Sequence, residues 1–218
     1  MENYFENNKS DLYGKEGIDV EYSQYNVGSF KEAVNSIEEE SNGINSFCIV
    51  DIDGTMIANK ITQYPGLCYL QKPRIGEDVL ETFPTLVDTF KYGNLCIATN
   101  RHEGVSFPWS SKEMMNFVGY YVDQFGVKIP RFTRQNKQLA ATKIGLSKRI
   151  ELSNYIIDYV VRNNVRNRLV IFSIQDLLPV SFKIDTFPKQ IGRMVVEDVR
   201  EILNRDILVE INDYVIHK

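Results

Sequence analysis

The sequence has few of the residue types that build disulfide frameworks and zinc sites. Its 218 residues include three cysteines and two histidines. Three cysteines cannot all pair, and Cys48 and Cys96 lie in apolar segments that are typical of buried strands. We therefore expect reduced thiols and an intracellular protein. With so few nitrogen and sulfur ligands, a metal site in this chain would consist of oxygen atoms and would bind a hard cation.

Long apolar runs and a strong charge bias are also lacking. No apolar run approaches the roughly 20 residues that a membrane-spanning helix needs, and the polar first ten residues contain no signal-peptide core. These features predict a cytoplasmic protein with no membrane partner. The net charge of −4 gives no sign of general nucleic-acid affinity. No linker or repeat divides the chain, so we expect one domain over residues 29–218, preceded by an extension over residues 1–28 of unknown role.

Short apolar runs alternate with segments of helical periodicity, which is the order typical of a parallel α/β sheet. Strands are predicted at 47–50, 94–98, 168–172 and 207–211, and helices at 29–40, 77–92, 110–125 and 194–203. Pro84 predicts a kink in the second helix or its division into two. The expected fold is α/β, a three-layer Rossmann-like arrangement around a mainly parallel central sheet.

Two carboxylates follow the first of these strands. Asp51 and Asp53 come directly after the apolar run, with Gly54 and Thr55 behind them. Open α/β sheets bind ligands at the carboxyl ends of their strands, where these acids would lie. An acidic N-cap that only starts the next helix is the alternative interpretation. The complete D-x-D-G-T pattern after a buried strand is more specific than a lone D-x-D and favours catalysis.

Polar residues also follow two later strands. Thr99, Asn100 and Arg101 come after the second strand, and Asp176 comes shortly after the strand at 168–172. Either group could instead cap a helix or form a turn. Residues 124–150 lack acidic residues and contain seven basic ones: Lys128, Arg131, Arg134, Lys137, Lys143, Lys148 and Arg149. Such a cluster forms either a solvated face or an electropositive rim for a polyanionic substrate.

The segment from Asp51 to Thr55 resembles the first motif of the haloacid-dehalogenase-like (HAD) phosphohydrolases. The resemblance implies that Asp51 is the nucleophile and Asp53 the general acid and base, and that Thr99 binds a phosphate oxygen. It also implies a charge-neutralising lysine, for which Lys148 is best placed and Lys143 is the rival. Substrate contacts would come from Gly54, Thr55, Asn100 and Arg101. Gln175 departs from the family pattern, because Gly or Asp is typical before the metal-binding acid.

The implied activity is that of a phosphatase, a Mg²⁺-dependent phosphomonoester hydrolase that forms an aspartyl-phosphate. Magnesium would be held by Asp51, the backbone carbonyl of Asp53 and Asp176, a shell of oxygen atoms and waters that this ion prefers. The segments between the motifs are short, so we expect no large cap domain and hence an open site. Family members of this minimal-cap type act on large substrates or close the site with a neighbouring subunit of a homo-oligomer. The basic segment makes a nucleotide or a nucleic-acid end a candidate substrate, and phosphosugars, other small phosphomonoesters and phosphoproteins are the alternatives. The alternatives are a catalytically weakened binding or assembly module and a phosphotransferase on the same scaffold.

Overall fold

The computed structural model describes residues 19–41, 43–57, 73–102, 111–134, 141–176 and 187–217, with the backbone alone at 100–102, 111, 133–134, 141–150 and 187. In these parts of the chain strands and helices alternate. The strands are β1 (Val20–Val27), β2 (Ser46–Val50), β3 (Leu95–His102), β4 (Arg131–Arg134), β5 (Arg168–Asp176) and β6 (Leu208–Ile216). The helices are α1 (Phe30–Glu40), α2 (Glu77–Thr89), α3 (Ser111–Asp123), α4 (Ala141–Arg162) and α5 (Phe187–Leu203), and a short 3₁₀ turn η1 (Gly43–Asn45) precedes β2.

The described strands form one sheet in the order β1-β6-β5-β2-β3-β4. Every neighbouring pair is parallel, which confirms the predicted α/β fold with a parallel sheet. From β2 the chain moves outward to β3 and β4, whereas from β5 it moves in the opposite direction to β6. The reversal places a topological switch point between β2 and β5. In open α/β sheets ligands bind outside the carboxyl ends of the strands at such a point.

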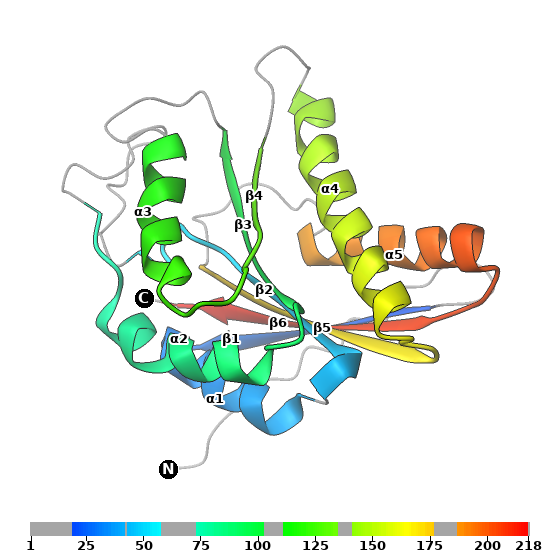
Figure 1. The fold of residues 1–218 in the computed structure, drawn as a ribbon, viewed down its shortest axis with the longest axis horizontal. Helices are drawn as coiled ribbons and strands as arrows, with labels where there is room; N and C mark the ends of the chain where they lie inside the picture. The colour runs from blue at the N-terminus through cyan, green and yellow to red at the C-terminus, as the bar shows by residue number, and fades with distance from the viewer. Residues whose placement is uncertain are drawn as a thin grey trace.

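Helices cover both faces of the sheet (Figure 1). One core lies between the sheet and α1, α2 and α3, and includes Phe83 and Leu86 of α2. A second core lies under α4 and α5 and includes Ile156 of α4 and Val195 of α5. All five residues of β2 are buried. Burial on both faces explains why this strand reads as an unbroken apolar run.

The structure corrects the boundary predicted at residue 29. Strand β1 begins at Val20 and pairs with β6 along its whole length, so part of the predicted extension belongs to the sheet. Its sequence carries little apolar signal because β1 is an edge strand in which only Tyr22 and Val27 are buried. Helix α2 is one helix that contains Pro84, rather than two shorter helices. Residues 1–18 of the predicted extension lie outside the described residues.

Two further expectations concern the thiols and the membrane. Cys48 and Cys96 are buried and free, as expected for core thiols. Burial raises the pKa of the Cys48 thiol, so this group stays protonated at neutral pH. Among the helices of the described residues, none is long and apolar enough to cross a membrane.

Candidate active site

The loop after β2 carries two half-buried carboxylates, Asp51 and Asp53, in a tight turn. The N–H of Asp51 donates to the carbonyl of Ile174 at 2.9 Å, which continues the pairing of β2 with β5 by one residue. The N–H of Met56 donates to the carbonyl of Ile52 at 3.0 Å and closes the turn. The side chains of Ile52 and Met56 are fully buried. These two buried side chains hold the loop against the core and keep the two carboxylates at the carboxyl end of the central strands.

Thr99 on β3 contacts this loop directly. Its side chain is almost completely buried, and Oγ1 donates to Oδ2 of Asp53 at 3.2 Å. The register between β3 and β4 is irregular from Ala98 to His102, where the strand leaves regular pairing. Irregularities of this kind redirect side chains and are common beside active sites. The geometry thus brings Asp53 and Thr99 together, although 45 residues separate them in sequence.

Asp176, the last residue of β5, packs onto Gly54. A Cβ atom at Gly54 would lie 2.6 Å from Cγ and 2.8 Å from Cβ of Asp176, and closer still to Oδ2. Gly54 also has a φ of +73°, in the left-handed region that favours glycine. The third acid therefore lies directly against the D-x-D-G-T loop. Only a residue without a side chain permits this approach.

The oxygen atoms at this end of the sheet are of the chemical kind that a hard cation such as Mg²⁺ prefers. Asp51, Asp53 and Asp176 supply carboxylate and carbonyl oxygens from two adjacent central strands. The buried hydroxyl of Thr55 lacks a hydrogen-bond partner among the described residues. An unsatisfied buried hydroxyl costs about 1–3 kcal/mol, which favours a further polar ligand or water at this point. Within the described residues no group of three His, Cys, Asp or Glu side chains is placed to hold a metal; the expected shell needs only two carboxylates and one backbone carbonyl.

Gln175, the residue that departs from the family pattern, points away from this edge. Consecutive strand residues face opposite sides of the sheet, so Gln175 and Asp176 diverge. Nε2 of Gln175 donates to Oδ1 and Oδ2 of Asp213 on β6, at 2.9 and 2.7 Å. Tyr22 of β1 donates to the same carboxylate at 2.8 Å. The glutamine therefore links β5 to β6, whereas Asp176 lies against Gly54.

Sequence reasoning missed Asp213, since no chemistry was assigned to residues beyond 180. The local signal was weak, because Asp213 follows Asn212 and lies near Glu210, in a polar stretch that a loop would also show. Asp213 is fully buried. Burial raises the pKa of its carboxyl group to about 6, against the hydrogen bonds from Tyr22, Ser173 and Gln175, which lower it. The hydrogen bonds that this buried carboxyl group accepts therefore help to hold the end of β5 against β6.

Asp213 predicts a specific dependence of stability on pH. Its pKa rises on folding from an ordinary 3.8 to about 6, so the folded chain retains a proton that the unfolded chain releases between these values. Its contribution to the free energy of unfolding should fall as the pH rises from 4 to 6, by about 2 kcal/mol. In Asp213→Asn this contribution disappears, and the amide of Gln175 can turn its oxygen towards the new amide. Urea unfolding of both chains from pH 4 to 7 tests this; equal pH slopes would contradict it.

The remaining predicted site residues lie at or near the carboxyl edge by their backbone position. Asn100 and Arg101 continue β3 beyond Thr99. Lys143 and Lys148 lie in the first half of α4, which starts on the side where β4 ends (Figure 1). The side chains of these four residues lie outside the described part of the structure. The choice between the two lysines is therefore still open.

Two of the seven basic residues do not lie at this edge. Lys128 precedes β4 and lines a cavity beside Gly93 and Leu95, at the amino end of β3. Arg131 starts β4, and its Nη1 donates to Oδ1 of Asp123 at 3.3 Å. The basic segment is therefore divided between the two ends of the sheet. It does not form a single rim around the candidate site.

No family model matches this chain, and no curated protein matches it.

Proposed function

We propose that this protein is a Mg²⁺-dependent phosphomonoester hydrolase of the HAD type, with Asp51 as nucleophile. The observation that carries the proposal is the packing of Asp176 against Gly54 at the switch point between β5 and β2. Asp176, the acid proposed to bind the metal, thus lies against the D-x-D-G-T loop that follows the neighbouring strand. The hydrogen bond from Thr99 to Asp53 adds the neighbouring strand β3 to the same site. The segments around Asp51, Thr99 and Asp176, which are distant in sequence, thus meet at the carboxyl end of the central strands.

The first half of the reaction transfers the phosphoryl group to the protein. A carboxylate oxygen of Asp51 attacks phosphorus, and the bond from phosphorus to the ester oxygen breaks. Asp53 gives its proton to the departing oxygen, which leaves as an alcohol. The hydroxyl of Thr99 donates to Asp53 at 3.2 Å in the structure, and with a phosphate bound its single proton can turn from Asp53 to a phosphate oxygen. The product of this half-reaction is an aspartyl-phosphate on Asp51.

The second half releases phosphate. Asp53, now a carboxylate, takes a proton from water, and the water oxygen attacks phosphorus. The bond from phosphorus to the Asp51 oxygen breaks, which restores both carboxyl groups. Mg²⁺ held by Asp51, the Asp53 carbonyl and Asp176 would neutralise negative charge on the phosphoryl group. Lys148 or Lys143 is proposed to add a second positive charge.

Phosphate release from a panel of esters tests the proposal. We expect release from an aryl phosphate, a nucleoside monophosphate or a 3′-phosphorylated oligonucleotide with Mg²⁺, and none with a chelator. Faster release from the oligonucleotide than from the small esters would identify a nucleic-acid end as the substrate. Transfer to an added alcohol in place of water would identify a phosphotransferase. Absence of release from every ester, together with absence of Mg²⁺ binding by calorimetry, would contradict the proposal and favour a binding module.

A further inference from the structure

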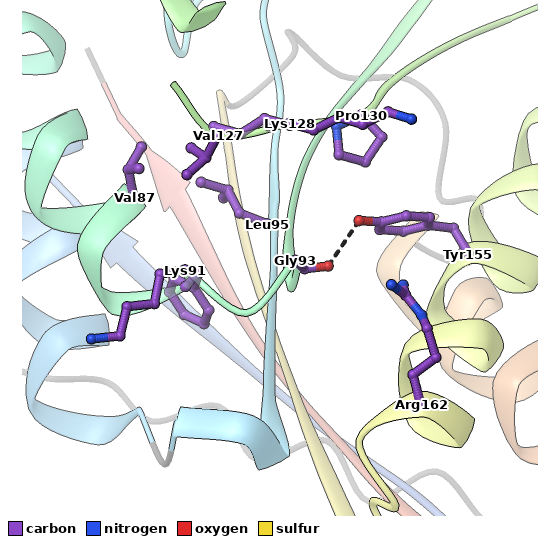
Figure 2. A pocket seen from close by; sticks show the side chains of 11 residues that line it. Val87, Lys91, Gly93, Leu95, Val127, Lys128, Pro130, Tyr155 and Arg162 are labelled. Carbon is purple, nitrogen blue, oxygen red and sulfur yellow. Dashed lines mark hydrogen bonds between the residues drawn. The ribbon is translucent and has the colours of Figure 1, made fainter. Parts of the chain in front are cut away.

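A second site lies at the opposite end of the sheet. A cavity of about 340 Å³ opens between the end of α2, the amino end of β3, the segment before β4 and the second half of α4 (Figure 2). Its volume lies within the range of small-molecule sites, which begins near 300 Å³. The cavity is lined by Val87, Phe90, Lys91, Gly93, Leu95, Val127, Lys128, Ile129, Pro130, Tyr155 and Arg162.

The floor of this cavity is apolar and its wall is fixed. The floor is formed by one aromatic side chain, Phe90, and two aliphatic side chains, Leu95 and Ile129. All three are buried. The hydroxyl of Tyr155 donates to the carbonyl of Gly93 at 2.8 Å, which joins α4 to the turn before β3. Burial raises the pKa of Tyr155, so its phenol stays neutral. The cavity therefore has a preformed apolar surface with a fixed aromatic side.

The rim of the cavity carries positive charge alone. Lys91, Lys128 and Arg162 line it, and no acidic residue does. In the described part of the chain, none of these three cations forms an ion pair with a carboxylate. The guanidinium of Arg162 points towards the hydrogen bond between Gly93 and Tyr155, whereas the Lys91 ammonium points outward (Figure 2). The long side chain of Lys91 can turn back over the opening by rotation about its own bonds.

The cavity is separate from the candidate active site. It contacts Leu95 at the start of β3, whereas Thr99 lies four residues further along the same strand. A strand rises about 3.3 Å per residue, so roughly 13 Å separate the two positions. A ligand of ordinary size in the cavity would therefore leave the catalytic edge accessible.

We propose that this cavity binds a small dianion that carries a flat apolar ring, the chemistry shared by aromatic dicarboxylates and nucleoside monophosphates. The ring covers Phe90, Leu95 and Ile129, and the two negative charges meet Arg162 and Lys128. Arg162 donates from Nε to the carbonyl of Asp158 and the Lys91 ammonium lies over the ring of Tyr92, so among the described residues neither positive charge is neutralised by a carboxylate. A bound dianion would offset the repulsion between these like charges. A polar rim around an apolar floor selects a ligand with both features.

Calorimetric titration of the full chain, without added Mg²⁺, tests this proposal with phthalate, adenosine monophosphate and succinate as probes. We expect phthalate or the nucleotide to bind at least tenfold more tightly than succinate, which has two charges but no ring. Binding of phthalate alone identifies a dicarboxylate site, and binding of the nucleotide alone identifies a nucleotide site. Failure of both to bind at millimolar concentrations would overturn the proposal, as would succinate binding as tightly as either.

A double variant, Lys128→Gln with Arg162→Gln, locates the binding. It should weaken binding by about tenfold or more, which is about 1.4 kcal/mol. The control, Lys112→Gln with Arg166→Gln, removes two exposed cations outside the cavity and should leave the affinity unchanged. Equal affinity of the two double variants would overturn the proposal.

Nuclear magnetic resonance of the unmodified chain locates the ligand independently. Its addition should shift the backbone amide resonances of Gly93 and Leu95 more than that of Thr99. A larger shift at Thr99 would place the ligand at the candidate active site and overturn the proposal.

Discussion

The Asp51→Asn chain is expected to release phosphate at least about 10³-fold more slowly than the unmodified chain, with its fold intact. The amide lacks the negative charge that makes a carboxylate oxygen a nucleophile, and it removes one charged ligand of the cation. The fold should be retained, because the backbone N–H of Asp51 still donates to the Ile174 carbonyl and an amide has nearly the same size as the carboxylate. Initial rates with saturating Mg²⁺ on the best ester of the panel measure the effect.

Two further variants show whether the effect belongs to this residue. Asp53→Asn should slow the reaction by a smaller factor, about 10²–10⁴-fold, since it removes a proton-transfer group and leaves the nucleophile. Asp88→Asn removes an exposed carboxylate on α2 and should leave the rate unchanged. A rate for Asp51→Asn within tenfold of that for Asp88→Asn would exclude Asp51 as the nucleophile.

Gly54→Ala should reduce both stability and activity, for two separable reasons. An alanine at a φ of +73° costs about 1–2 kcal/mol through backbone strain alone. The new Cβ would also collide with Asp176, whose Cγ lies 2.6 Å from its position. The side chain of Asp176 must then leave the loop. We expect Mg²⁺ affinity and phosphate release to fall by about 10–100-fold, the loss typical of a disturbed metal environment.

Gly126→Ala is the matched control for this substitution. Gly126 has a φ of +69°, but an added Cβ would meet nothing within 4 Å. It should therefore show the strain cost in urea unfolding and retain full activity and Mg²⁺ affinity. If Gly54→Ala retained as much activity as Gly126→Ala, the packing of Asp176 on the loop would have no catalytic role.

The sequence predicted the central part of the sheet because burial there leaves a strong local signal. Strand β2 is buried on both faces, and its apolar run was recognisable without any structure. Strand β1 was not predicted, since an edge strand with two buried residues has no such run. The ends of β5 and β6 extend beyond the predicted ranges for a related reason, because polar residues such as Gln175 and Asp213 continue the pairing. Their pattern is typical of a loop, and only their partners on neighbouring strands make them part of the sheet.

The contents of the site were predictable in part and its contacts were not. Asp51, Asp53 and Thr99 could be predicted as site residues because they follow apolar strands closely. The placement of Asp176 over Gly54 depends on β5 pairing with β2, a contact between segments more than 100 residues apart. The bond between Gln175 and Asp213 depends in the same way on the pairing of β5 with β6. Local patterns contain no information on such pairings.

Trapping of the covalent intermediate tests the central claim most directly. The unmodified chain is mixed briefly with Mg²⁺ and its best ester, quenched in acid, digested and examined by mass spectrometry. The account predicts one phosphoryl group on Asp51, removed by hydroxylamine as an acyl phosphate should be, and absent from Asp51→Asn. A phosphoryl group on another residue, or full turnover by Asp51→Asn, would contradict the assignment of Asp51 as the nucleophile.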